Sequence, residues 1–144
     1  MANEARVFAE GHENCIVRSF TVADGTAVPK GTLLVESSSR TGIAHTAAVK
    51  KAVLGYTTMS KEASDGRTQV GCQRTGVVAA ILDGQAATGD IAIAGQTTAN
   101  RVQALRGSGV ADFMSVYDSQ FQILGRFIEG GADGTTVKLA LTLG

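Results

Sequence analysis

The sequence is poor in the residues that build bulky cores. Its 144 residues include no tryptophan, five phenylalanines and two tyrosines. A core must therefore be made mostly of valine, isoleucine, leucine and alanine, and the chain is long enough for one domain with a core of its own. The single proline excludes a proline-rich linker, whereas the 18 glycines predict many tight turns.

Cysteine and histidine are also scarce, with two of each. Two cysteines do not make a disulfide framework, so we expect Cys15 and Cys72 to be free thiols in a reducing cytosol, with Cys72 the more buried of the two. His12 lies in a His-Glu-Asn-Cys segment that offers potential ligands, but no second cluster completes a tetrahedral zinc site. We therefore expect no metal site and no cofactor.

An excess of charge of either sign is absent, because 13 basic residues balance 13 acidic ones. Binding to nucleic acid or to an anionic membrane surface needs clustered lysine and arginine. We expect neither partner. A net charge near zero also reduces the repulsion between copies that pack side by side.

Long apolar runs are missing as well. The longest, Val77–Leu82, is far too short to cross a bilayer. The first residues, Met1–Phe8, lack the basic region followed by an apolar stretch that marks a signal peptide, so we expect none.

The pattern that the sequence does contain is the two-residue period of β-strands. Thr136–Leu143 alternates four large apolar residues with smaller or polar ones, which places the four on one face of a strand. Val77–Leu82 is apolar at every position, which predicts a central strand buried on both faces. Further strands are expected at Ile16–Val22, Thr32–Glu36, Ile91–Ala94 and Phe121–Ile128.

Asp-Gly pairs separate these segments and favour tight hairpin turns. Helical signal is weak and allows one or two turns at His45–Val53 and at Val110–Gln120. The sequence therefore predicts an all-β fold, a compact β-barrel or β-sandwich-like domain with short hairpins and at most one or two short helices. The Asp-Gly pairs are Asp24-Gly25, Asp65-Gly66, Asp83-Gly84 and Asp133-Gly134.

An internal repeat supports the β prediction. Ala23–Val35 resembles Leu82–Ile93, because in each an Asp-Gly pair and small residues precede a second glycine that opens a strand. We interpret the chain as a flexible N-terminal arm, residues 1–15, and a single β domain, residues 16–144, with two similar units at about 22–78 and 81–143. The alternative is a chance recurrence of turn residues. Later matches are Gly55, Asp65-Gly66 and Val70 with Gly125, Asp133-Gly134 and Val137.

Motifs of catalysis are not found. Ser108 lies between two glycines, but the segment has neither the spacing of a nucleophile elbow nor that of a dinucleotide-binding loop. We therefore expect no enzyme and no catalytic residue. Four carboxylates in polar, turn-like surroundings are expected on a solvated surface: Glu62, Asp65, Asp112 and Asp118.

Two segments are candidates for binding a partner. Phe113, Met114 and Tyr117 belong to residue types that are enriched in interface cores. A short helix that covers the β core is the alternative for this segment. Val7 and Phe8 in the arm could pair with the exposed strand edge of a neighbour, and the alternative there is simple disorder.

From about residue 16 to the end, glycine-punctuated segments follow one another in a fixed order. They are Val22–Val35, Val53–Tyr56, Gln69–Val70 leading to Gly76–Val78, Ile123–Ile128 and Ala132–Leu141. In this order of turns and strands the sequence resembles the small head decoration proteins of tailed phages.

The resemblance implies a structural virion protein, usually a homotrimer, that is made in the host cytoplasm and sits on the capsid exterior. Such proteins stabilise the head by binding the expanded shell and clamping neighbouring subunits of the major capsid protein. The alternative is a non-enzymatic β-barrel binding module, lectin-like or carrier-like. A carrier would be modified on Lys30, Lys50 or Lys51, but the turn that presents the modified lysine is missing after Glu36.

Overall fold

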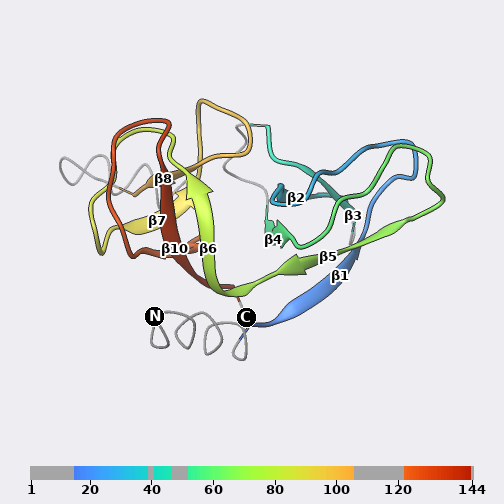
Figure 1. The fold of residues 1–144 in the computed structure, drawn as a ribbon, viewed down its shortest axis with the longest axis horizontal. Helices are drawn as coiled ribbons and strands as arrows, with labels where there is room; N and C mark the ends of the chain where they lie inside the picture. Colours follow the sequence, from blue (N-terminus) through green and yellow to red (C-terminus); the bar gives the residue numbers. More distant parts are fainter. Residues whose placement is uncertain (1–14, 39–40, 47–51, 106–121, 144) are drawn as a thin grey trace, which may run out of the picture.

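The computed structural model describes residues 15–38, 41–46, 52–105 and 122–143. These residues form ten strands and no helix, so the predicted all-β class is confirmed (Figure 1). The strands are β1 Val17–Thr21, β2 Leu33–Ser38, β3 Thr41–Ala44, β4 Val53–Thr57, β5 Gln69–Gln73, β6 Thr75–Ile81, β7 Ile91–Ala94, β8 Val102–Ala104, β9 Gly125–Phe127 and β10 Thr136–Thr142.

The first five strands close into a barrel in the order β1-β3-β2-β4-β5. All pairs are antiparallel except β1 with β3, which meet in parallel at Thr21 and Thr41 and close the barrel. The last five strands form a sheet in the order β6-β10-β9-β7-β8, and a parallel bridge from Leu82 to Val102 brings its two ends together.

The strand pairing of the first group recurs in the second. The pairs β1–β5, β2–β3, β2–β4 and β4–β5 correspond to β6–β10, β7–β8, β7–β9 and β9–β10. An isolated bridge between Val28 and Lys61 has its counterpart between Ala86 and Gly131. We call the two groups the first unit and the second unit, and the pairing divides the chain between them at Arg74.

Two apolar cores organise the units. One core lies inside the barrel and contains Leu34 and Leu54. The other contains Leu33 and Val35 of β2 together with inward-facing residues of all five strands of the second unit. The strands β2 and β4 lie between the cores, so every residue of β4 is buried. The barrel core consists of Val22, Val28, Leu34, Leu54, Val70 and Cys72, with Phe20 packed against it.

The predicted central strand at Val77–Leu82 is wrong. β6 pairs only with β10 in its sheet, Ala79 is exposed and the side chain of Ile81 is 38% exposed. The strand lies at an edge, and of its outer apolar residues Val77 is half-buried whereas Ala79 and Ile81 are exposed. The prediction for Thr136–Leu143 is confirmed, because Val137, Leu139 and Leu141 are buried on one face of β10.

Arg74 joins the two units. It separates β5 from β6, where the chain changes direction sharply (Figure 1). Its guanidinium donates hydrogen bonds to the carbonyl oxygens of Leu54 in the first unit (2.8 Å) and of Leu143 after β10 (3.3 Å). Its own N–H donates to Ile16, and its carbonyl accepts from Leu143. The junction therefore bonds to strands of both units.

Two of the Asp-Gly pairs, Asp65-Gly66 and Asp133-Gly134, lie in the connections between antiparallel neighbours, β4 with β5 and β9 with β10. The other two, Asp24-Gly25 and Asp83-Gly84, connect strands that do not pair with each other. In the first unit, Asp24 accepts a hydrogen bond from the N–H of Gly66 (2.8 Å). In the second unit, Asp133 accepts one from the N–H of Gly84 (2.8 Å). Each unit thus ties its two Asp-Gly turns together through one carboxylate.

Of the two segments predicted to hold a helical turn, Val110–Gln120 lies outside the described residues. His45–Val53 is described only at its ends, where Val53 begins β4.

Gly55 sits in β4 where the chain comes very close to β5. Its φ is +136°, and a Cβ atom there would meet the carbonyl oxygen of Gln73. We expect Gly55→Ala to lower the free energy of unfolding by at least about 2 kcal/mol, because the substitution adds backbone strain and a main-chain clash. Urea unfolding measures the change.

Gly25 provides the matched control, since no atom lies within 4 Å of an added Cβ. Gly25→Ala should alter the free energy of unfolding by no more than about 0.5 kcal/mol. Equal effects of the two substitutions would contradict the close approach at Gly55.

Candidate functional site

The residues predicted to bind a partner lie outside the described part of the chain. This holds for Val7 and Phe8 of the arm and for Phe113, Met114 and Tyr117. Their roles stay predictions. Among the residues that are described, there is no cluster of three or more His, Cys, Asp or Glu that could hold a metal ion, and no helix has the length and apolarity needed to cross a membrane.

The cysteines occupy different environments, as predicted. Cys72 is fully buried in the barrel core and Cys15 is half-buried, and both are free thiols. Burial raises the pKa of the Cys72 thiol to about 12, although Arg74 opposes the shift. Cys72 is therefore protonated at neutral pH and packs as a small apolar side chain.

His45 is a buried structural group between the two units. Its Nε2 lies 2.9 Å from the carbonyl oxygen of Gly95, and its Nδ1 accepts a hydrogen bond from the N–H of Asn100 (3.0 Å). The neutral ring with the proton on Nε2 satisfies both partners. Burial lowers the pKa of His45, while the Gly95 carbonyl and Asp83 act in the opposite direction.

Among the described residues, Lys61 is the largest side chain that is fully buried. Its ammonium donates hydrogen bonds to the carbonyl oxygens of Asp24, Thr26 and Glu62. The carboxylates of Asp24 and Asp65 lie 3.7 Å and 3.6 Å from it. The charge is thus balanced and fully hydrogen-bonded, which a buried cation requires.

Asp65 is exposed, as the sequence predicts, and its carboxylate also belongs to the cluster around Lys61. Its carboxylate accepts hydrogen bonds from the N–H groups of Arg67 and Glu62, and these bonds lower the pKa of Asp65. Asp112 and Asp118 lie outside the described residues.

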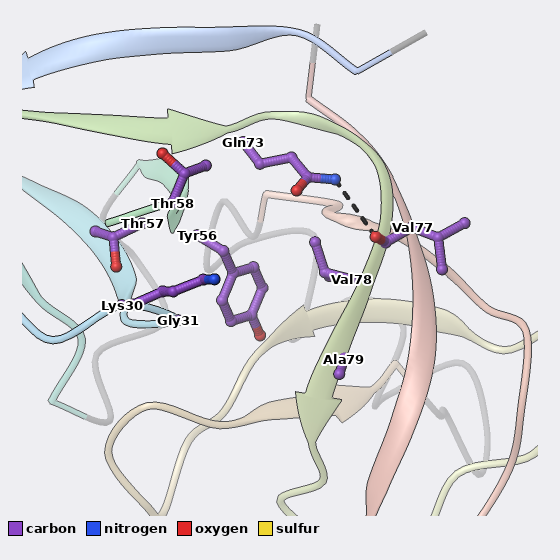
Figure 2. Close-up of a pocket in the computed structure, with 9 residues that line it drawn as sticks. All are labelled: Lys30, Gly31, Tyr56, Thr57, Thr58, Gln73, Val77, Val78 and Ala79. Atoms are coloured by element: carbon purple, nitrogen blue, oxygen red, sulfur yellow. Dashed lines mark hydrogen bonds between the residues drawn. The ribbon is translucent and has the colours of Figure 1, made fainter. Parts of the chain in front are cut away.

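A cleft of about 320 Å³ lies where the first unit faces β6 (Figure 2). One wall is formed by Lys30 and Gly31 before β2, and the opposite wall by Val77–Ala79 of β6. Tyr56–Thr58 and Gln73 complete the lining. Three segments that are distant in sequence, residues 30–31, 56–58 and 73–79, therefore build this site.

A second hollow, of about 710 Å³, lies against β1. It is lined by Val17–Thr21 and by Gln69 of the neighbouring strand. Because one strand pair forms the whole lining, this hollow is a broad depression and the cleft is the better-built site.

Tyr56 stands between the two walls of the cleft. Its side chain is 5% exposed, and its hydroxyl has no hydrogen-bond partner among the described residues. Figure 2 shows the ring beside Lys30, with the hydroxyl on the side away from Gln73. Burial raises the pKa of Tyr56 far above its ordinary value, so the phenol is neutral at neutral pH.

No pattern in the sequence predicts this cleft. Lys30 was considered only as a site of modification, and no strand was expected at Tyr56. No periodic signal links these positions, because the pairing of β4 with β5 and the bend at Arg74 bring them together.

Comparison with known proteins adds information on the fold. No protein-family model matches the sequence, and no curated protein matches it. Among solved structures, the chain is similar to the head fiber gp8.5 N base of bacteriophage phi29, with a TM-score of 0.56 and 16% sequence identity. The match covers 88% of this chain and 95% of that one, so the two share their fold over almost their whole length.

The environment of His45 predicts that stability falls at acid pH. The folded pKa is lowered, so below the ordinary value of about 6.5 the unfolded chain binds a proton that the folded chain does not. Protonated Nδ1 would also face the N–H of Asn100. The free energy of unfolding should therefore decrease as the pH falls from about 6.5 toward the lowered pKa.

Urea unfolding at several pH values tests this expectation. His45→Gln should remove the part of the slope that arises from His45, whereas His12→Gln, at a position predicted to be solvated, should keep it. An unchanged slope in His45→Gln would contradict the assignment.

Tyr56→Phe should raise the free energy of unfolding by about 1 kcal/mol, because a buried hydroxyl without a partner is costly. Thermal and urea unfolding measure the change. Tyr56→Leu serves as the control, since it removes ring packing as well as the hydroxyl and should be destabilising. A Phe variant less stable than the parent would show that the hydroxyl has a partner.

Proposed function

We propose that this chain is a structural protein of a phage virion that attaches to the outside of the head. The observation that carries the proposal is the shared fold with the head fiber gp8.5 N base of bacteriophage phi29, over 95% of that chain. At 16% identity the likeness concerns the fold, and the function follows from it as a proposal supported by the resemblance of the sequence to head decoration proteins.

The contacts of Lys61, His45 and Cys72, side chains that often act in catalysis, support a structural and non-enzymatic role. Lys61 holds together the turns at Asp24 and Glu62, and His45 bonds to the backbone of Gly95 and Asn100. Cys72 packs in the barrel core. These groups stabilise the fold and are not presented in the cleft.

We propose further that the protein is a homotrimer that clamps neighbouring subunits of the expanded major capsid protein. A ligand that binds only the mature shell stabilises it by mass action, by about 2.7 kcal/mol per site at a free concentration of one hundred times Kd. Trimerisation would multiply weak contacts on the repeating lattice of the head.

The test uses heads of the phage that encodes the chain, purified without this protein before and after expansion. We expect saturable binding to expanded heads, no binding to unexpanded heads, and a higher temperature of head disruption after binding. Sedimentation of the free protein should give the mass of a trimer. Absence of binding to expanded heads would contradict the proposed function, and a monomer would contradict the trimer alone.

A further inference from the structure

The outer edge of β6 is a row of main-chain groups that no strand pairs with in the described structure. The N–H of Leu143 donates to Arg74, and the N–H of Leu82 donates to Thr135. In an antiparallel pair, alternate residues bond to the partner strand, so even-numbered residues from 74 to 82 face β10. The main-chain groups of Thr75, Val77, Ala79 and Ile81 therefore point away from β10.

The edge lacks the features that normally protect a strand edge. Thr75–Ile81 contains no charged residue and no proline. Native proteins usually block an exposed edge with such residues or cover it. β1, the corresponding strand of the first unit, carries the charged residue Arg18.

Gln73 makes this edge rich in hydrogen-bond donors. Its Nε2 donates to the carbonyl oxygens of Thr75 (3.0 Å) and of Val77 (3.4 Å), the second of which is drawn in Figure 2. The N–H groups of Val77 and Ala79 point away from β10, and among the described residues β6 pairs with no other strand on that side. Gln73 thus occupies carbonyl acceptors of this edge, whereas the N–H donors of Val77 and Ala79 are left for a partner strand.

The facing wall of the cleft also offers hydrogen-bond donors, from the ammonium group of Lys30. Lys30 lines the cleft, is exposed and forms no ion pair with any described residue. An occupant of the cleft must therefore offer hydrogen-bond acceptors to the amides of β6 and a negative charge to Lys30. A volume of about 320 Å³ admits a short stretch of chain and not a folded domain.

We propose that the edge of β6 and Lys30 form a docking site for an extended, acidic segment of a partner polypeptide. The segment adds as a strand beside β6, where its carbonyl groups accept from Val77 and Ala79 and a carboxylate pairs with Lys30. In the context of the proposed function, on which this last step rests, the segment belongs to a protein of the phage head.

The first test uses the whole ¹⁵N-labelled chain and the peptide acetyl-Val-Glu-Val-Glu-Val-amide. We expect the amide signals of Val77 and Ala79 to shift, with a Kd of about 1 mM. The peptide with glutamine in place of glutamate should bind more weakly to the parent. Lys30→Gln should remove this preference for glutamate, and Lys30→Arg should retain it.

The second test removes one outward amide. Ala79→Pro deletes an N–H that points away from β10, so the β6–β10 pairing is kept, and we expect peptide affinity to fall at least about fivefold. Ala79→Ser keeps the amide and should bind as the parent does. If the proline variant does not fold, slower hydrogen exchange of the Val77 and Ala79 amides on peptide binding replaces it.

The outcomes separate the two proposals. The docking site would be overturned if the amide signals of β6 did not shift at peptide concentrations up to several times the expected Kd. It would also be overturned if a folded Ala79→Pro variant bound the peptide as tightly as the parent. Peptide binding without binding to expanded heads would leave the docking site standing and contradict the proposed function. Loss of both peptide and head binding in Ala79→Pro supports the site and its place on the head.

Discussion

The arrangement of the two units depends on Arg74. This residue bonds through its guanidinium to the carbonyls of Leu54 and Leu143, and through its main chain to Ile16 and Leu143. The guanidinium also lies 5.7 Å from the centre of the Phe20 ring. One residue thus bonds to both units at the bend between β5 and β6. That bend sets the second unit against the outer faces of β2 and β4 and opens the cleft beside β6.

The parts of the fold that the sequence predicts are those where one face is buried. In β10 the two-residue alternation matches the burial of Val137, Leu139 and Leu141. At Val77–Leu82 the same reasoning failed, because a fully apolar run does not distinguish a central strand from an edge strand with small residues. β4 was missed because its burial on both faces leaves no alternation, and Gly55 weakens its strand signal.

The candidate site could not be predicted in the same way. The site consists of the outward N–H groups of β6, the carbonyl oxygens that accept from Gln73, and Lys30 on the facing wall. Strand register brings these groups together, and register cannot be read from residue types alone. The recurrence of Asp-Gly pairs and glycines predicts related structure in the two halves. We infer from the matching strand pairs that the halves are related units, in which Lys61 of the first has Gly131 as its counterpart.

The division of the cores has a consequence for folding during synthesis. The barrel core draws only on residues from Phe20 to Cys72, so it can form before the second unit has left the ribosome. The other core needs strands of both units, and the pairing of β6 with β10 joins residues about sixty positions apart. Because such distant contacts form slowly, the apolar outer faces of β2 and β4 remain open to solvent and to other chains until β10 is in place. Aggregation of the nascent chain is thus a risk confined to this interval.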